Sequence, residues 1–181
     1  MEKVSVFIDG GYLDHIIQDI GKKVDYSKLA RKLCGSDNFM RAYYYHCLPY
    51  QSDPPTEEEK TRFSKASAFF DRLKRLDRFQ IRLGKLAKRG NYSDGNPILI
   101  QKRVDVYLAT DLVKFSARKG MDQAVLLTSD SDYVPAIAAS KEFGVIVKLA
   151  YYDNLSINQE LLDACDERFS FSASFFDDIL R

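Results

Sequence analysis

Two short, strongly apolar runs in the chain are each followed at once by acidic residues. The run VSVFID ends in Asp9, and the run AVLLT, residues 124–128, comes just before Asp130 and Asp132. Short runs of Val, Ile and Leu bounded by turn residues are typical of strands buried on both faces of a parallel sheet. In open α/β sheets, ligands bind outside the carboxyl ends of such strands. We therefore expect these aspartates to lie at the ligand-binding edge of an α/β fold.

The rest of the chain alternates strand and helix patterns and contains no internal repeat. Further strands are expected at residues 39–48, 80–86, 98–100 and 145–150, and helices at residues 12–20, 25–33, 56–76, 104–119 and 133–143. Residues 51–56 and 88–97 have loop composition. The alternation predicts one doubly wound α/β domain over residues 1–181, a mostly parallel sheet with helices on both faces. Its core is expected at about residues 3–150, with the tail 151–181 packed on it.

Composition sets limits on where such a protein acts. The chain has 181 residues, 45% of them apolar, and no apolar run near the roughly 20 residues that span a bilayer. Its three cysteines show no metal-binding or redox spacing, so free thiols are expected. The residues before the first expected strand lack an apolar stretch, so we expect no signal peptide. We expect a cytoplasmic protein with no membrane contact, either a monomer or a homodimer.

Positive charge is concentrated in one segment although the net charge is only +1. Residues 60–103 contain thirteen Lys and Arg against three acidic residues, so the remainder of the chain is strongly acidic. Basic side chains beside an acidic metal-binding region suit a phosphodiester substrate. The alternative is a solvated helix face. We favour a nucleic-acid partner because the excess has one sign.

Asp105, which opens the helical pattern after Val104, is a further acidic candidate. Carboxylates gathered at one edge would repel one another and raise each other's pKa unless a cation neutralised them. Oxygen ligands alone suit magnesium or manganese better than zinc. Each aspartate also has a structural alternative, since Asp130 or Asp132 can be an N-cap and Asp105 can favour a helix start.

Three blocks together carry a resemblance to a known family. They are VFIDGGYL at residues 6–13, KRVDVYLATDL at residues 102–112 and LTSDSDYVPAI at residues 127–137. In this order they resemble the NYN domain, in its LabA-like branch, within the PIN-like nuclease superfamily. The resemblance covers about residues 3–150 and implies a Rossmann-like fold with an acidic Mg²⁺-binding pocket and ribonuclease activity. Arg103 and Ser129 stand where the family often has glycine, which affects how closely a phosphate approaches the backbone.

The resemblance also implies roles for individual residues. Asp9, Asp105 and Asp130 would hold Mg²⁺ or Mn²⁺, with Asp132 as a fourth catalytic carboxylate. A metal-activated water would then hydrolyse a phosphodiester bond of RNA by in-line attack. The residues expected to contact the substrate are Lys102, Arg103, Ser129 and Tyr12, the last by stacking on a base, with packing as its alternative.

The sequence is also compatible with two other functions. The same fold can serve as a catalytically silent nucleic-acid-binding or regulatory module. A phosphatase of the haloacid dehalogenase kind is suggested by Asp130 and Asp132, but that family needs its Asp-x-Asp after the first strand, where this chain has Asp9-Gly-Gly. Of the two histidines, His46 is a minor candidate for the cleft because it lies near the carboxyl end of a predicted strand, and His15 is expected on the surface or in packing.

Overall fold

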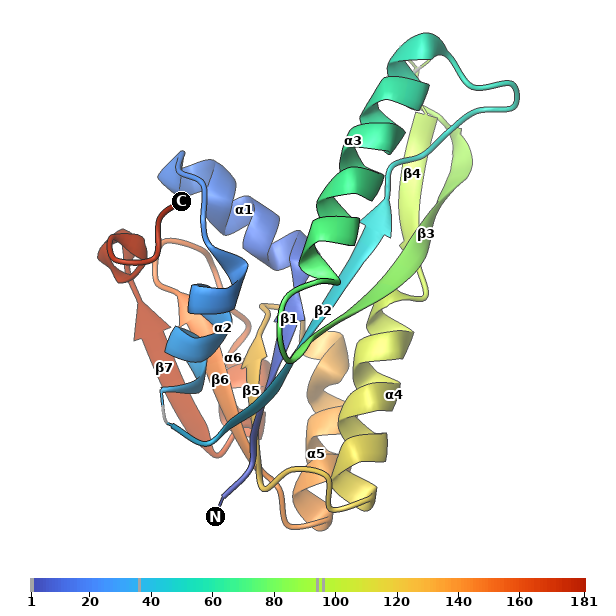
Figure 1. Ribbon diagram of the computed structural model, residues 1–181. Helices are drawn as coiled ribbons and strands as arrows, with labels where there is room; N and C mark the ends of the chain where they lie inside the picture. Colours follow the sequence, from blue (N-terminus) through green and yellow to red (C-terminus); the bar gives the residue numbers. More distant parts are fainter. Residues whose placement is uncertain (1, 36, 94, 96) are drawn as a thin grey trace.

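A single sheet organises the chain in the computed structural model, which describes residues 2–35, 37–93, 95 and 97–181. Across this part of the chain the strand order is β4-β3-β2-β1-β5-β6-β7 (Figure 1). The strands are β1 (Val4–Asp9), β2 (Phe39–Leu48), β3 (Phe79–Asn91), β4 (Pro97–Lys102), β5 (Gln123–Leu127), β6 (Ile146–Tyr152) and β7 (Glu167–Phe171). All neighbours pair in parallel except β4, which runs antiparallel to β3. The α/β class with a mostly parallel sheet is thus confirmed.

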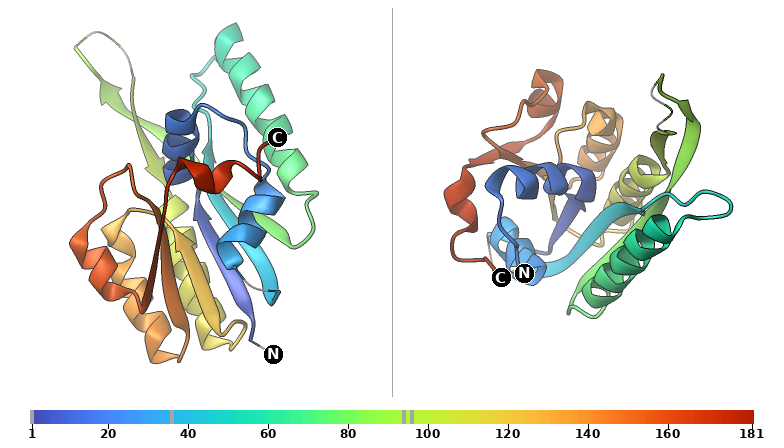
Figure 2. Two further views of the ribbon diagram at one scale, coloured as in Figure 1. Left: turned by 90° about the vertical axis from the view of Figure 1, so that its left-hand side faces the viewer. Right: turned by 90° about the horizontal axis from the view of Figure 1, so that it is seen from above.

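Helices cover both faces of the sheet (Figure 2). They are α1 (Gly10–Ile20), α2 (Tyr26–Cys34), α3 (Glu57–Leu73), α4 (Val104–Ala117), α5 (Val134–Glu142) and α6 (Gln159–Ala164), with the short 3-10 helices η1 (Ser131–Tyr133) and η2 (Ala173–Phe176). Successive side chains of β1 point to opposite faces of the sheet and so contribute to two apolar cores, one on each face. Val6 and Ile8 pack with α1, α2 and α3, whereas Phe7 packs with α4, α5 and α6. Burial on both faces explains why this strand is a continuous apolar run.

Strands that follow β1 in the chain are added first on one side of it and later on the other. From β1 the chain proceeds to β2 and β3 on one side, and after α4 it returns to β5 on the other side of β1. The edge beyond the carboxyl ends of β1 and β5 is therefore a topological switch point, where open α/β sheets bind their ligands. Asp9 ends one of these two strands and Asp130 follows the other.

A hairpin arm extends beyond that edge. Leu48 at the end of β2 pairs with Lys85, yet β3 continues to Asn91 and pairs back with β4 (Figure 1). The predicted strand at 80–86 was therefore too short, and the predicted loop at 88–97 was wrong for Lys88–Asn91. Cross-strand hydrogen bonds outweigh the loop-like composition there. The rest of that loop includes residues 94 and 96, which lie outside the described part of the chain.

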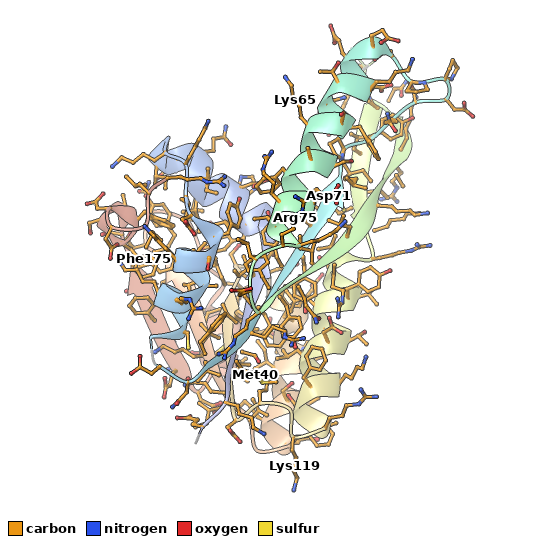
Figure 3. The ribbon with its side chains drawn as sticks, viewed as in Figure 1. Met40, Lys65, Asp71, Arg75, Lys119 and Phe175 are labelled. Carbon is orange, nitrogen blue, oxygen red and sulfur yellow. The ribbon has the colours of Figure 1, made fainter. Side chains whose placement is uncertain are left out.

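Helix α3 begins with a capping box. The Thr56 side chain accepts from the Glu59 amide at 3.2 Å, and the Glu59 carboxylate accepts from the Thr56 amide at 2.9 Å. On its inner side Phe70 and Leu73 are buried, while Lys65 extends into solvent (Figure 3).

Among the described residues, no helix has the length and apolar character that a membrane crossing requires.

The C-terminal segment completes the sheet and covers α2. Strand β7 pairs with β6, and Phe171 and Phe176 are part of the core that also contains α1 and α2. Phe175 lies beside α2, where the Lys32 ammonium sits over its ring at 4.6 Å (Figure 3). The aromatic tail therefore packs on its own domain. The three cysteines are thiols outside any disulfide, as predicted, and all three are buried.

A buried ion pair connects α4 to the sheet. The Asp111 carboxylate, on a residue only 7% exposed, accepts from Arg82 Nε and from the Tyr45 hydroxyl, each at 3.1 Å. Both donors reach the same oxygen, Oδ2. Asp111 is thus a structural residue that holds the helix whose first turn carries Asp105.

Replacing Asp111 with Ala is expected to lower the free energy of unfolding by about 2 kcal/mol, because it leaves the Tyr45 hydroxyl and the partly exposed Arg82 guanidinium without their shared acceptor. Urea denaturation would measure this. Asp71→Ala is the control, since it breaks an exposed i,i+3 pair with Lys74 and should leave stability unchanged. Equal effects of the two substitutions would contradict the assigned role.

Candidate functional site

Three elements bring aspartates to the switch-point edge of the sheet. Asp9 is the last residue of β1, Asp130 follows β5 by three residues, and Asp105 is the second residue of α4. The strands that carry the first two are hydrogen-bonded neighbours. Electrostatic repulsion acts between Asp9 and Asp105 and between Asp105 and Asp130. The structure thus gathers the residues that the sequence predicted to lie together.

Three hydrogen-bond donors, two backbone amides and one hydroxyl, hold the Asp9 carboxylate. Its Oδ1 accepts from the amides of Gly11 at 3.0 Å and Tyr12 at 3.2 Å, so Asp9 is the N-cap of α1. Its Oδ2 accepts from the Thr128 hydroxyl at 3.0 Å. Burial raises the pKa of Asp9, the repulsion from Asp105 adds to this, and these hydrogen bonds offset it only in part. The helix therefore starts at Gly10, two residues earlier than predicted.

Asp130 is fixed by a turn that follows β5. Its amide donates to Thr128 Oγ1 at 3.2 Å, and its Oδ1 accepts from the Asp132 amide at 2.9 Å. Asp130 is thus the N-cap of η1, a role that the sequence made more probable for Asp132. Asp132 is exposed and lies two positions further on, within η1.

Asp105 is poised between a buried tyrosine and the other acids. The Tyr133 hydroxyl donates to Asp105 Oδ1 at 3.3 Å. Asp105 is an exposed residue, yet partial desolvation of its carboxylate raises its pKa, and the charges of Asp130 and Asp132 raise it further. Burial first, and then the surrounding carboxylates, raise the pKa of Tyr133 far above its usual value, so this hydroxyl stays protonated and remains a donor. Sequence reasoning missed Tyr133 and Thr128 as site residues, although both lie in the third of the three sequence blocks.

The donor chemistry of this cluster fits a hard divalent cation. Its ligands are carboxylate oxygens whose mutual repulsion a cation would relieve. Among residues 2–35, 37–93, 95 and 97–181, no three acidic, histidine or cysteine side chains are close enough together to enclose a metal ion. Mg²⁺ requires fewer, because it keeps several waters and is held by one or two carboxylates. One or two of the carboxylates of Asp9, Asp105 and Asp130 therefore suit an open, partly hydrated cation site.

The basic residues next to Asp105 lie where the junction of β4 and α4 passes close to β3. Lys102 and Arg103 are exposed at the junction of β4 and α4. A Cβ on Gly84 would lie 2.5 Å from the Lys102 carbonyl oxygen and 2.6 Å from Val104 Cγ2, so only glycine lets the junction pass this close to β3. Arg103 has φ 79°, in the left-handed region that favours glycine. Arg103 thus adopts a left-handed conformation that suits glycine, the residue often found at this position in the family that the sequence resembles.

Of the other candidates, Tyr12 turns away from the open edge. It is 5% exposed, and its hydroxyl accepts from the Tyr152 amide at 3.0 Å. The expectation that it stacks on a base does not match this burial, and the alternative, packing, does. A ring directly after Gly11 is enclosed once β6 lies beside α1. Ser129 is half-buried between Thr128 and Asp130, within reach of the same edge.

His46 contributes to the wall of the site from β2. Its Nε2 lies 2.8 Å from Asp14 Oδ2 on α1, and its ring stacks on Tyr44. Burial lowers the pKa of His46, but the hydrogen bond and charge of Asp14 outweigh burial and raise it overall. A Cβ on Gly10 would lie 2.3 Å from His46 Cδ2, so glycine is required there for α1 to start this close to β2. His15 is exposed.

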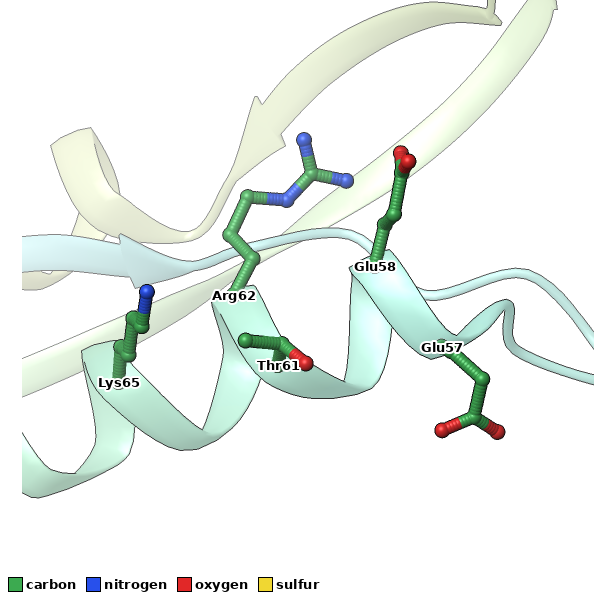
Figure 4. A pocket seen from close by; sticks show the side chains of 5 residues that line it. All are labelled: Glu57, Glu58, Thr61, Arg62 and Lys65. Atoms are coloured by element: carbon green, nitrogen blue, oxygen red, sulfur yellow. The ribbon is translucent and has the colours of Figure 1, made fainter.

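A groove of about 510 Å³ lies on α3, away from these acids. It is lined by Glu57, Glu58, Thr61, Arg62 and Lys65, and by none of the four aspartates (Figure 4). Glu58, Arg62 and Lys65 point to one side of the helix and Glu57 to the other. Acids in a first helical turn stabilise the helix through its dipole. We therefore assign the chemistry to the sheet edge and treat the groove as helix surface.

Comparison with known proteins bears on family and fold. The family model described as NYN domain matches residues 3–173, a span that runs through β7. Among solved structures, a protein of unknown function from Vibrio parahaemolyticus RIMD 2210633 aligns with a TM-score of 0.65 at 17% identity, covering 99% of this chain and 96% of that chain. At this identity the likeness concerns the fold alone. Curated proteins gave no match.

Replacing Asp105 with Asn is expected to raise the melting temperature at pH 7 without divalent cations, because it removes a charge that burial and neighbouring carboxylates disfavour. Since the pKa of Asp105 is raised by folding, the wild type loses stability as pH rises through that pKa. The advantage of the variant should therefore vanish at a pH below the usual value of 3.8.

Thermal melts in EDTA at the two pH values would test this. Asp77→Asn, in the exposed turn before β3 at the opposite edge of the sheet, is the control and should have no effect. A destabilised Asp105→Asn variant at pH 7 would contradict the electrostatic account.

Proposed function

The chain belongs to the NYN domain family, within the PIN-like nuclease superfamily, and on this premise we propose that it is a metal-dependent ribonuclease. The observation that carries the proposal is the meeting of Asp9, Asp105 and Asp130 at the switch point, where each comes from a different element and burial and repulsion raise the pKa of two of them. Carboxylates arranged at a cost to the fold are typical of catalytic sites.

Mg²⁺ or Mn²⁺ fits this donor set, and Asp9, Asp105 and Asp130 are the residues that would hold it, with Asp132 beside them. When bound, such a cation activates water and neutralises charge on a reacting phosphate. The hydrogen bonds to Asp9 and Asp130 fix those carboxylates before any ligand arrives. Tyr133 orients Asp105 in the same way. A carboxylate of this cluster accepts the proton of the attacking water.

The substrate is proposed to be RNA, held by cationic side chains on one side of the acids. Lys102 and Arg103 directly precede the helix that carries Asp105, and both are exposed. Exposed Lys and Arg continue onto α3 and the hairpin arm, in the segment 60–103 that holds most of the chain's excess positive charge. Such side chains neutralise phosphates on either side of the one that reacts.

Cleavage of labelled single-stranded RNA tests the proposal directly. We expect cutting with Mg²⁺ or Mn²⁺, none in EDTA, and a loss of at least about a hundredfold in Asp130→Asn and in the double variant Asp9→Asn, Asp105→Asn. Asp77→Asn should cut like the wild type. Equal cutting by all proteins would reject the site, and RNA binding without cutting would identify a catalytically silent module.

Replacing Arg103 with Gly should weaken RNA binding and reduce the slope of log affinity against log salt by about one, because one phosphate contact is lost. Stability should change by no more than about 1 kcal/mol, since relief of the left-handed backbone is offset by greater freedom of the unfolded chain. Salt titration of binding in EDTA measures the first effect and urea denaturation the second.

Lys119→Gly is the matched control. Lys119 also has a left-handed backbone, with φ 50°, and loses the same charge, but it lies at the opposite end of α4 (Figure 3). An unchanged salt slope in Arg103→Gly, or an equal fall in Lys119→Gly, would remove Arg103 from the binding surface.

A further inference from the structure

A small pocket lies beside the acidic edge, between the end of β2, helix α3 and strand β4. Its volume is about 250 Å³. Pro49, Tyr50, Leu86 and Leu99 give it apolar and aromatic walls. Polar groups at its border come from Arg62 on α3, Gln101 on β4 and His46 on β2. Apolar walls with a few converging polar groups are the usual composition of a ligand site.

This pocket adjoins Asp9 through two glycines. Gln101 Nε2 lies 3.5 Å from the position that a Cβ on Gly11 would take, and the Gly11 amide donates to Asp9 Oδ1. On the other side, His46 borders the pocket and touches the Cβ position of Gly10. A ligand in the pocket is therefore separated from the Asp9 carboxylate only by the first turn of α1.

We propose that this pocket binds one unpaired nucleobase of the RNA strand, adjacent to the phosphate at the acidic edge; the inference rests on the proposed function and narrows its substrate to RNA unpaired at that position. A base has apolar faces and a polar edge, which match the walls and the border of the pocket. Tyr50 provides a ring for stacking, and the Gln101 amide provides two donors and an acceptor for the base edge.

Size and charge favour a base in a strand over other occupants. A volume of about 250 Å³ is below the range of about 300–1,000 Å³ typical of drug-sized ligands. Leu99, 39% exposed, is a large apolar residue left partly open at the border of the pocket, among the basic side chains of the arm. A base in a duplex has its faces covered by its neighbours, so only an unpaired nucleotide can enter.

Binding of a short fluorescent RNA in EDTA, by anisotropy, tests the proposal without cleavage. We make a series in which one nucleotide at a time is replaced by an abasic residue. For the wild type, the abasic replacement should weaken binding about tenfold at one position, the effect of losing one stacked base. Tyr50→Ala should bind the intact RNA about tenfold more weakly and lose this dependence on position. Tyr50→Phe should retain both.

Tyr92→Ala is the matched control, because Tyr92 is a 60% exposed tyrosine just after β3 that does not line the pocket. Gln101→Ala, which keeps the walls, gives a second variant if Tyr50→Ala fails to melt like the wild type. The same abasic profile in the wild type, Tyr50→Ala and Gln101→Ala would overturn the proposal. A free mononucleotide that binds as tightly as the oligonucleotide would also overturn it.

The outcome is separable from that of the cleavage assay. Aspartate-dependent cutting with no effect of Tyr50 or Gln101 would reject the base pocket and leave the ribonuclease intact. A Tyr50-dependent abasic position in a protein that cuts no RNA would support the pocket and reject catalysis.

Discussion

The two oxygens of the Asp9 carboxylate hold together the centre of this protein. One oxygen caps α1, and the other accepts from the end of β5. Because β1 lies between β2 and β5, this residue fixes the start of the first helix and the alignment of the two strands on which the fold reverses direction. Asp105 and Asp130 take up their positions around Asp9.

The arrangement of charges and backbone at this edge lowers the stability of the protein when no ligand is bound. Burial and repulsion raise the pKa of Asp9 and Asp105, and Arg103 takes a backbone conformation that disfavours side chains. Two apolar cores, one on each face of the sheet, offset these costs. The two aspartates whose charges are disfavoured thus lie at one edge, where a ligand can relieve their repulsion, and this placement is itself a sign of function.

Much of this could be predicted from the sequence because strands buried on both faces are continuous apolar runs. Strand β2 was predicted to its exact bounds, Phe39–Leu48, and the edge that gathers the aspartates follows from such strands. The full length of β3 could not be predicted, since Lys88 and Arg89 are unremarkable in a loop and become strand only through pairing with β4. The burial of Tyr12 likewise depends on β6, which follows more than 130 residues later. The capping role of Asp9 was not predicted, because glycines such as Gly10 and Gly11 are poor helix formers and the helix was expected to begin only at residue 12.

The bond between Thr128 and Asp9 joins residues 119 positions apart in the chain. During synthesis from the N-terminus, β1 and β2 can pair early, but the partner strand β5 and the turn bearing Asp130 arrive only after most of the chain has been made. Contacts of such long separation form slowly, after the entropy of closing the intervening chain has been overcome. An incomplete or partly folded chain therefore lacks the assembled edge, so on the proposed function a nascent chain would have no power to cut the messenger RNA from which it is being translated.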